Sequence, residues 1–405
     1  MSARVILGVG AGIAAYKACE LLRLLTESGH RVRVIPTPDA LRFVGEATWA
    51  ALSGEPVTTD AWTEVSEVPH VRLGQSADLV LVVPATADLL ARAAVGMAGD
   101  LLTATLLTAR CPVLYAPAMH TEMWQHVATQ ANVSLLRSRG AVVLEPAVGR
   151  LTGADSGAGR LPEPPEIFAV AVAMLGRDTK TAMSLKGRRV VVSAGGTREE
   201  IDPVRFIGNW STGTQGYALA RTAVARGAEV TVIAANVTLP DPAGAKVTRV
   251  VSAREMQDAV TAAAFQGGAD AVVMAAAVAD YRPETRSAGK VKKDGGAPQP
   301  LRLTENPDIL AGLAEQRGHG GHGKRPVLVG FAAETDTSPQ AARAKLARKG
   351  CDLLVVNPVG NGLGFGTADN EAVVYAADGM VTQIPRGPKE ALANVVWDLV
   401  AADLA

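Results

Sequence analysis

A glycine-rich turn near the start of the chain has the spacing of a phosphate-binding loop. The residues GAGIAA at positions 10–15 fit the pattern G-x-G-x-x-A and follow an apolar run that predicts a strand. Backbone amides at such a helix start bind phosphate groups. A dinucleotide site would also need an acidic residue at the end of the second strand, to hold the ribose hydroxyls. Thr37 stands there instead, and its hydroxyl suits a mononucleotide phosphate better than a ribose diol.

A second phosphate-binding pattern lies in the other half of the chain. Ser211, Gly213 and Gly216 in STGTQG can wrap backbone amides around a phosphate at a helix N-terminus. The absence of a G-x-x-x-x-G-K-[ST] motif excludes a P-loop nucleotide hydrolase. Asp280 follows a predicted strand and can touch a metal or a ribose, and KVKK at 290–293 offers lysines to a triphosphate. Taken singly, these patterns also fit an ordinary helix start and a solvated charged face.

The stretch LTGADSGAGR, residues 151–160, contains three glycines and no apolar periodicity. This composition predicts neither a helix nor a strand. We expect either a plain surface connection or a flap that closes over a reaction.

Short apolar runs predict the strands that position these residues. In the first half they are 4–9, 31–35, 78–83, 112–116 and 141–144. Between the first two, apolar residues recur at helical spacing until Gly29, which ends the helix. Strands alternating with helices predict a doubly wound, parallel sheet, whose loops at the carboxyl ends of the strands converge. PATAD (84–88) and APAMHTEMW (116–124) are such loops.

The alternation of predicted strands and helices resumes after a helix expected at 165–178. Six further strands are predicted at 188–194, 229–235, 270–276, 326–332, 352–357 and 371–376. We therefore expect an α/β fold with two doubly wound, mainly parallel sheets. The predicted domains are 1–178 and 188–405, joined by a linker at 179–187.

Composition narrows the class of protein. The 405 residues are enough for two domains, and 48% of them are hydrophobic. Forty basic residues balance forty acidic ones, which argues against bulk binding to nucleic acid or to an anionic membrane.

The three cysteines lack CxxC spacing and are expected to be buried, inert thiols. His319 and His322 have no third ligand type nearby, so a solvated insertion is favoured over a metal site. With no apolar run of about 18 residues and no signal peptide, we expect a cytoplasmic enzyme.

The first half resembles the flavin-dependent cysteine decarboxylases, and nearly the whole chain resembles the bifunctional phosphopantothenoylcysteine decarboxylase/phosphopantothenate–cysteine ligases of coenzyme A synthesis. The segments that carry the first resemblance are GIAAYKACEL (12–21), VPHVRL (68–73), PATA (84–87), PAMHTEMW (117–124) and GADSGAGR (153–160). The resemblance implies a flavodoxin-like domain that binds FMN through Gly10, Ala11, Thr37, Thr86, Ala87 and Thr103. It implies His70 as the base that helps the substrate thiolate to form. It further implies substrate contacts from Met119, His120, Met123 and Thr152.

Two positions depart from the family pattern. The family has asparagine where this chain has His120, and a flap cysteine, which acts as the acid, where this chain has Gly153. Thr152, Asp155 or a water could deliver that proton. Alternatively, the first half binds flavin without catalysing the reaction and acts as a scaffold for the ligase.

The second half resembles the ligase part of the same family. The segments that show this resemblance are 193–220, 275–283, 290–293, 305–310, 330–335 and 342–357. The resemblance implies a Rossmann-like domain in which CTP activates phosphopantothenate as an acyl-cytidylate and the amine of cysteine displaces CMP. Asn209 would steady the acyl-cytidylate, Asp280 would act near Mg²⁺ and the triphosphate, and Lys290 would neutralise phosphate charge. Further substrate contacts are expected from Ala275, Pro307, Asp308, Ile309, Leu310, Phe331, Lys345 and Lys349. The motif GNWSTGTQG departs from the common NRSSGKMG at Trp210 and Gln215, among other positions.

The sequence thus predicts a fused enzyme that makes phosphopantothenoylcysteine with CTP and decarboxylates it to phosphopantetheine with FMN. The family resemblance implies trimers through the flavin halves and dimers through the ligase halves, hence a closed homo-oligomer such as a dodecamer. Neither nucleic acid nor a membrane is expected as a partner. An NAD-dependent dehydrogenase with two Rossmann sheets is disfavoured by Thr37.

Overall fold

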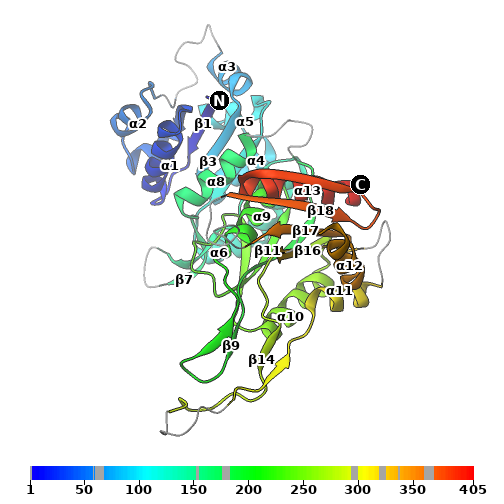
Figure 1. Cartoon of the computed structure of the whole chain (residues 1–405). Coiled ribbons are helices and arrows are strands. Elements are labelled where there is room, and N and C mark those ends of the chain that lie inside the picture. Colours follow the sequence, from blue (N-terminus) through cyan, green and yellow to red (C-terminus); the bar gives the residue numbers. More distant parts are fainter. Residues whose placement is uncertain are drawn as a thin grey trace. The chain divides into compact units, whose positions relative to one another are not determined.

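The structure is a computed structural model that describes residues 2–57, 59, 68–151, 155–175, 183–292, 300–318, 325–335, 338–359 and 369–405. The chain divides into two compact α/β units (Figure 1). The first comprises Met1–Gly187, Val224–Ala228 and Pro240–Ala245, and the second comprises Arg188–Ala223, Glu229–Leu239 and Lys246–Ala405. Thr152, Gly153, His319, His322 and residues 179–182 of the predicted linker lie outside the described residues.

The first unit is built on a five-stranded sheet in the order β2-β1-β3-β4-β5. All four pairings are parallel, which is the flavodoxin-like order. The strands are β1 (Arg4–Val9), β2 (Arg31–Pro36), β3 (Leu79–Ala85), β4 (Val113–Pro117) and β5 (Val142–Val143). The predicted parallel sheet is confirmed.

Helices connect these strands. They are α1 (Ala15–Glu27), the 3₁₀ helix η1 (Pro38–Arg42), α2 (Glu46–Ser53), α3 (Pro69–Ser76), α4 (Ala87–Val95), α5 (Leu101–Thr108), α6 (Thr121–Gln125), α7 (Val127–Ser138) and α8 (Pro164–Leu175). In α1 the predicted apolar stripe is fully buried at Ala18, Leu21 and Leu25. The helix stops before Gly29, whose φ of +84° suits glycine.

The prediction for the glycine-rich stretch is wrong at residues 156–160. Strand β7 (Ser156–Arg160) pairs antiparallel with β6 (Ala147–Arg150). In a two-stranded ribbon the backbone N–H and C=O groups pair with those of the partner strand, so the ribbon can form without alternating apolar side chains. The glycines serve close packing instead, because an added Cβ would lie 2.2 Å from Thr121 Oγ1 at Gly157 and 2.2 Å from the Met119 carbonyl oxygen at Gly159.

The second unit is built on an eight-stranded mixed sheet in the order β12-β11-β8-β13-β16-β17-β18-β19. Its strands are β8 (Arg189–Gly195), β11 (Glu229–Ala235), β12 (Ala245–Val250), β13 (Ala271–Met274), β16 (Val327–Glu334), β17 (Leu353–Pro358), β18 (Asp369–Ala376) and β19 (Val381–Pro388). The pairings from β11 to β17 are parallel, and β18 and β19 are added antiparallel. The edge strands β12 and β19 were not predicted, because most of their side chains are partly or fully exposed and they carry few apolar residues.

The helices of the second unit pack on this sheet. They are α9 (Thr214–Ala225), α10 (Ala253–Thr261), the π-helix η3 (Ala262–Gln266), α11 (Ile309–Arg317), α12 (Pro339–Lys349) and α13 (Lys389–Leu404). A buried cluster of β8, β13, β16 and α11 residues, including Val191, Val272, Leu328 and Leu313, forms part of the core.

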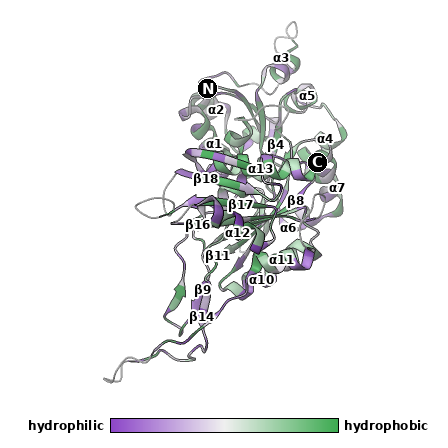
Figure 2. Cartoon of the chain, turned by 45° about the vertical axis from the view of Figure 1, so that its right-hand side comes forward, coloured by the Kyte–Doolittle hydropathy of each residue, from purple (hydrophilic) through white to green (hydrophobic). Residues whose placement is uncertain are grey.

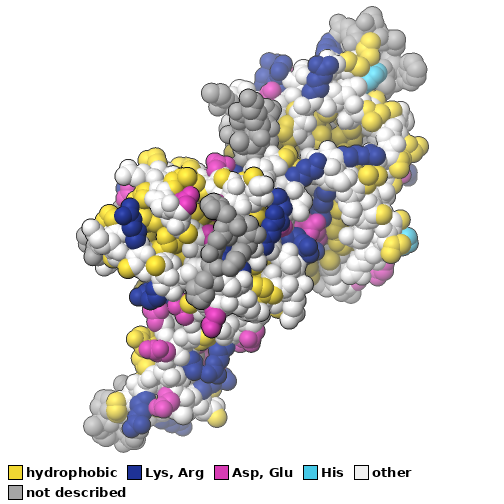
Figure 3. All heavy atoms as spheres, turned by 90° about the vertical axis from the view of Figure 1, so that its right-hand side faces the viewer, with side chains coloured by type: hydrophobic (Ala, Val, Ile, Leu, Met, Phe, Trp, Pro, Cys, Tyr) yellow, Lys and Arg dark blue, Asp and Glu magenta, His cyan; other side chains and the backbone are white. Residues whose placement is uncertain are grey.

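Two short antiparallel ribbons form an arm of the second unit. They pair β9 (Arg198–Glu200) with β10 (Phe206–Gly208), and β14 (Tyr281–Pro283) with β15 (Leu303–Glu305). The ribbons extend together beyond the sheet (Figures 1 and 2). Basic and acidic side chains are interspersed over the arm in the space-filling view (Figure 3).

The three cysteines are free thiols. Cys351 is buried as predicted, whereas Cys19 and Cys111 are half-buried. Burial raises the pKa of Cys111 to about 11 and that of Cys351 to about 12, so both stay protonated near neutral pH. Within the described part of the chain, every helix is too short or too polar to cross a membrane.

Candidate active sites

The strand order of the first unit reverses between β1 and β3, and the predicted FMN residues lie at this point. Gly10 follows β1, and its N–H donates to the Pro84 carbonyl oxygen at 3.0 Å. A Cβ at Gly10 would lie 2.5 Å from that oxygen, so only glycine permits this approach. Thr37 follows β2, and its N–H donates to the Val9 carbonyl oxygen at 2.9 Å. Ligands of open α/β sheets bind at such a switch point.

Thr37 carries an unsatisfied hydroxyl. The residue is only 5% exposed, and its Oγ1 has no hydrogen-bond partner. A buried polar atom left in this way costs about 1–3 kcal/mol and is rare in native proteins. The unpaired Thr37 hydroxyl at this edge therefore fits a contact with a phosphate group.

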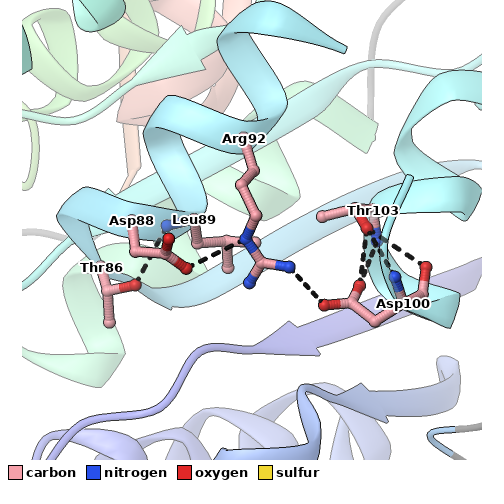
Figure 4. A network of polar contacts seen from close by, with 6 residues as sticks. All are labelled: Thr86, Asp88, Leu89, Arg92, Asp100 and Thr103. Carbon is pink, nitrogen blue, oxygen red and sulfur yellow. Dashed lines mark hydrogen bonds and ion pairs between the residues drawn. The ribbon is translucent and has the colours of Figure 1, made fainter. Parts of the chain in front are cut away.

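Thr86 and Ala87 begin helix α4 at the same edge. The Thr86 hydroxyl accepts a hydrogen bond from the Leu89 N–H at 3.2 Å and so caps the helix (Figure 4). Ala87 is the first residue of α4, and Ala11 follows Gly10 in the first loop. The helix start directs its remaining free N–H groups toward the carboxyl ends of the strands.

Thr103 is already engaged within the protein. Its N–H donates to Asp100 Oδ1 at 2.8 Å, and its hydroxyl lies 2.8 Å from the same oxygen. Arg92 bridges Asp100 and Asp88, with Nη1 2.7 Å from Asp100 Oδ2 and Nε 3.0 Å from Asp88 Oδ2 (Figure 4). Burial opposes ionisation of Asp100, but the hydrogen bonds from Thr103 and Arg92 hold its pKa below the usual value. Sequence reasoning missed this network, although Asp100-x-x-Thr103 has the spacing of a capping box.

His70 lies in α3 with an unpaired ring nitrogen. Its Nδ1 is buried and has no hydrogen-bond partner. Its carbonyl oxygen accepts a hydrogen bond from Thr108 Oγ1 at 2.6 Å, which ties α3 to α5. In the described ranges, no hydrogen bond joins the His70 side chain to another predicted site residue. The position of the imidazole is therefore set through the His70 backbone, which Thr108 holds.

The predicted substrate segment is attached to the β6–β7 ribbon. The Met119 N–H donates to the Gly159 carbonyl oxygen at 2.9 Å. His120 Nδ1 lies 3.1 Å from Asp155 Oδ2, and both side chains are about half exposed. Met123 is also exposed. The sequence named His120 and Asp155 separately, but their pairing emerges only from the fold.

The second unit contains a cleft of about 1100 Å³. It lies where the strand order reverses between β8 and β13. The predicted ligase residues that line it are Asn209, Ala275, Asp280, Pro307, Asp308, Ile309, Leu310, Phe331, Lys345 and Lys349. These residues come from loops far apart in the sequence, and the sheet brings them to one opening.

Hydrogen bonds fix the loop after β13, which forms the centre of this cleft. The Ala277 N–H donates to the Gly195 carbonyl oxygen at 2.8 Å, and the Ala279 N–H donates to Thr197 Oγ1 at 2.9 Å. Asn209 Nδ2 donates to the Val278 carbonyl oxygen at 3.0 Å. This bond uses one N–H of the Asn209 amide and leaves the other N–H and Oδ1 for a ligand.

The N-terminus of α9 opens into the cleft. Thr212, Gly213, Thr214 and Gln215 all line it, and the Gly213 N–H donates to Ser211 Oγ at 3.3 Å. Gly213 has a φ of +82°, which favours glycine. The arrangement presents the partial positive charge of the helix end to the cleft.

Lys389 and Asn370 also line the cleft, and sequence reasoning missed both. Asn370 Nδ2 donates to Gln215 Oε1 at 3.2 Å, and Gln215 Nε2 donates to the Lys389 carbonyl oxygen at 3.3 Å. Burial lowers the pKa of Lys389. No local signal could have found this cluster, because Gln215 lies more than 150 residues from both Asn370 and Lys389 in the chain.

Helix α12 presents three cations to the cleft. Lys345, Arg348 and Lys349 line it, and their spacing of three and four residues places them on one helix face. Lys345 Nζ lies 2.6 Å from Glu334 Oε1, and Lys349 Nζ lies 2.6 Å from Asp308 Oδ2. Arg348 was not predicted, although its spacing from Lys345 was a usable signal.

Lys290 stands apart from the other predicted ligase residues. It is exposed and is not among the residues that line the cleft. The next residue, Val291, is held by the arm, because its N–H donates to Asp202 Oδ2 at 3.1 Å and its carbonyl oxygen accepts from Arg205 Nη2 at 2.6 Å. Among the described residues, no group of three histidine, cysteine or acidic side chains could hold a metal ion, Asp280 included.

Two family models match the chain. The model described as "Flavoprotein" matches residues 1–176, and the model described as "DNA/pantothenate metabolism flavoprotein C-terminal domain" matches residues 185–404.

Relatives of known name match over nearly the whole length. The chain is 58% identical to the coenzyme A biosynthesis bifunctional protein CoaBC of Mycobacterium tuberculosis, covering 99% of this chain and 97% of the relative. It is 43% identical to the protein of the same name from Bacillus subtilis, covering 94% and 92%. Among solved structures, the C-terminal domain of a CoaBC protein is 33% identical, with a TM-score of 0.45, covering 55% of this chain and 98% of that one.

Proposed function

This chain belongs to the family of bifunctional coenzyme A biosynthesis proteins, and from that membership we propose that it performs two consecutive reactions. The second unit joins cysteine to phosphopantothenate with CTP, and the first unit decarboxylates the product to phosphopantetheine. The observation that carries the first assignment is the cleft of about 1100 Å³ that gathers the predicted ligase residues. We assign the reactions to domains 188–405 and 1–178, in keeping with the spans of the two family models.

The ligase reaction consists of two displacements. A carboxylate oxygen of phosphopantothenate attacks the α-phosphorus of CTP, and pyrophosphate leaves. The amine of cysteine then attacks the acyl carbon, and CMP leaves with the electron pair of the acyl–oxygen bond. Both steps develop negative charge on phosphate oxygens, so the site needs positive charge and N–H donors.

The cleft supplies these groups. The N-terminus of α9 offers backbone amides to the phosphates, and the α12 face adds Lys345, Arg348 and Lys349. The free N–H of the Asn209 amide can donate to the acyl-cytidylate, while its bond to the Val278 carbonyl holds the amide in orientation. Pro307–Leu310 and Phe331 complete the nucleotide contacts, and the role expected for Lys290 is to neutralise phosphate charge.

Asp280 can supply one carboxylate to a Mg²⁺ ion whose other ligands are mainly phosphate oxygens of the substrate and water. It is an exposed carboxylate on the cleft wall. Mg²⁺ commonly binds one or two carboxylates together with phosphate oxygens and water. When bound, it stabilises the pyrophosphate leaving group.

The first unit fits FMN at the edge formed by Gly10, Ala11, Thr37, Thr86 and Ala87. The unsatisfied Thr37 hydroxyl supports this assignment, because a phosphate oxygen would complete it. When bound, the flavin supplies two-electron redox chemistry. Thr103 contributes by holding the start of α5 through Asp100.

His70 and the substrate segment act on the thiol and the carboxylate of the product. A neutral imidazole with an unpaired nitrogen can accept the thiol proton. Asp155 orients the His120 ring through Nδ1, and in the protonated ring Nε2–H would donate to the substrate carboxylate beside Met119 and Met123. The His120–Asp155 pair is also a proton source close to the position where the family has its cysteine.

Two assays on the purified protein test the proposal. Pyrophosphate release should require both CTP and phosphopantothenate and should fall strongly in Asn209→Ala. Carbon dioxide release from phosphopantothenoylcysteine should require FMN and fall strongly in His70→Ala. Pyrophosphate release without carbon dioxide from a yellow protein would instead support a non-catalytic, flavin-binding scaffold.

Assembly and location belong to the same proposal. We expect a closed homo-oligomer in the cytoplasm, and light scattering on the full chain measures the assembly. A monomer at micromolar concentration would contradict it.

A further inference from the structure

Trp210 is the one tryptophan in the described part of the chain that lies in water. Its residue is 86% exposed, whereas Trp49, Trp124 and Trp397 are buried. Tryptophan carries a large apolar surface and one N–H donor, so full exposure of its indole is unusual. Trp210 also lines the ligase cleft.

The loop that carries Trp210 is held on both sides of it. Asn209 is tied to the Val278 carbonyl, and a Cβ on Gly196 would lie 2.7 Å from the Asn209 carbonyl oxygen. After Trp210, Ser211 Oγ accepts from the Gly213 N–H, and the hydroxyls of Thr212 and Thr214 lie 2.7 Å apart. The indole therefore follows a residue that is anchored to the loop after β13 and precedes a turn with its own local hydrogen bonds.

The position of this loop selects one part of the substrate. Trp210 lies between Asn209 and the start of α9, on the β8 side of the sheet. The start of α9 beside it is proposed for the phosphates of CTP, whereas the other predicted nucleotide contacts lie mainly on α11, α12 and β16, and β13 separates β8 from β16 in the sheet. The indole thus lies next to the residue proposed to hold the acyl group.

We propose that Trp210 is a substrate-positioning residue that packs its indole against the acyl chain of phosphopantothenate. This inference rests on the proposed ligase function. The acyl chain carries a geminal dimethyl group and one amide plane, which are suitable surfaces for an aromatic face. Trp210 is not among the predicted nucleotide contacts, so we expect it to contribute to the selection of the acid.

Fluorescence tests the contact without turnover. The Trp210→Phe spectrum, subtracted from that of the wild type, isolates the Trp210 emission. In the free protein this emission should be that of a solvent-exposed indole, quenched readily by acrylamide. Phosphopantothenate added without cysteine should shift the emission to shorter wavelength and protect it from acrylamide, whereas CTP alone should not. An emission that is protected before any substrate is added would overturn the proposal, because the indole would then already be covered.

Steady-state kinetics test whether this contact contributes to the binding of phosphopantothenate. In Trp210→Ala the KM for phosphopantothenate should rise about 10-fold, which corresponds to about 1.4 kcal/mol, while the KM for CTP changes less than twofold. Trp210→Phe should recover most of the loss. Met380→Ala is the matched control, because Met380 is an exposed apolar residue that is not among the cleft-lining residues.

The outcomes separate this inference from the proposed function. An unchanged KM for phosphopantothenate in Trp210→Ala, or a rise in the KM for CTP alone, refutes the acyl contact while wild-type turnover stands. The absence of CTP-dependent pyrophosphate release from the wild-type protein would refute the ligase function itself.

Discussion

Replacing Thr37 by valine should change the stability of the flavin-free protein and its affinity for FMN in opposite directions. The Thr37 hydroxyl is buried and unpaired, and an unmet polar group of this kind costs about 1–3 kcal/mol. Valine has nearly the same shape and removes that cost. We expect the first unit of the flavin-free variant to gain about 1 kcal/mol, or about 2–4 °C in Tm. FMN should bind about 10- to 150-fold more weakly, since a hydrogen bond to a charged group contributes about 1.5–3 kcal/mol.

Calorimetry and a flavin titration measure the two effects. The transition of the first unit is identified as the one that FMN raises, and FMN affinity follows from quenching of flavin fluorescence. Thr105→Val is the matched control, because Thr105 is equally buried but its hydroxyl donates to the Leu101 carbonyl oxygen at 2.7 Å. This control should lose about 1 kcal/mol of stability and keep its FMN affinity. If Thr37→Val melts below the wild type, or binds FMN as tightly, the hydroxyl does not serve the flavin phosphate.

Three further perturbations test other parts of the molecule. Gly159→Ala places a Cβ 2.2 Å from the Met119 carbonyl oxygen at a φ of +144°. We therefore expect the free energy of unfolding, measured in urea, to fall by about 1–3 kcal/mol and the KM for phosphopantothenoylcysteine to rise. Wild-type values of both would contradict the packing of the ribbon. The Arg205 side chain holds the pKa of Asp202 well below its usual value; the carboxylate therefore stabilises the fold above about pH 4, and this contribution disappears as the pH falls further. Asp202→Asn should reduce that acid dependence in urea unfolding, and an unchanged pH profile would count against it. Removal of Mg²⁺ with EDTA should stop pyrophosphate release without altering the flavin spectrum, and continued release would rule out the role proposed for Asp280.

Local patterns in the sequence determined the framework of both units. The periodicity of α1 and the apolar runs of the strands predicted two parallel sheets, because burial on one helix face or on both faces of a strand leaves a regular trace in the chain. The residues that follow these strands, among them Thr37 and Asp280, could be placed at the carboxyl edges of the sheets for the same reason, whereas the role of Asn209 came from the family resemblance. Thr37, which stands where a dinucleotide site needs an acidic residue, also argued against NAD.

Only the tertiary structure decided which of these side chains are available and what they touch. Thr103 is occupied by Asp100, His120 is paired with Asp155, and Lys290 lies away from the cleft that its predicted partners share. The cluster of Gln215 with Asn370 and Lys389 joins segments more than 150 residues apart. Such contacts depend on packing between distant segments, whereas periodicity records only the burial of each segment by itself. The sequence therefore determines the edges at which chemistry can occur, and the packed fold determines which atoms remain free to perform it.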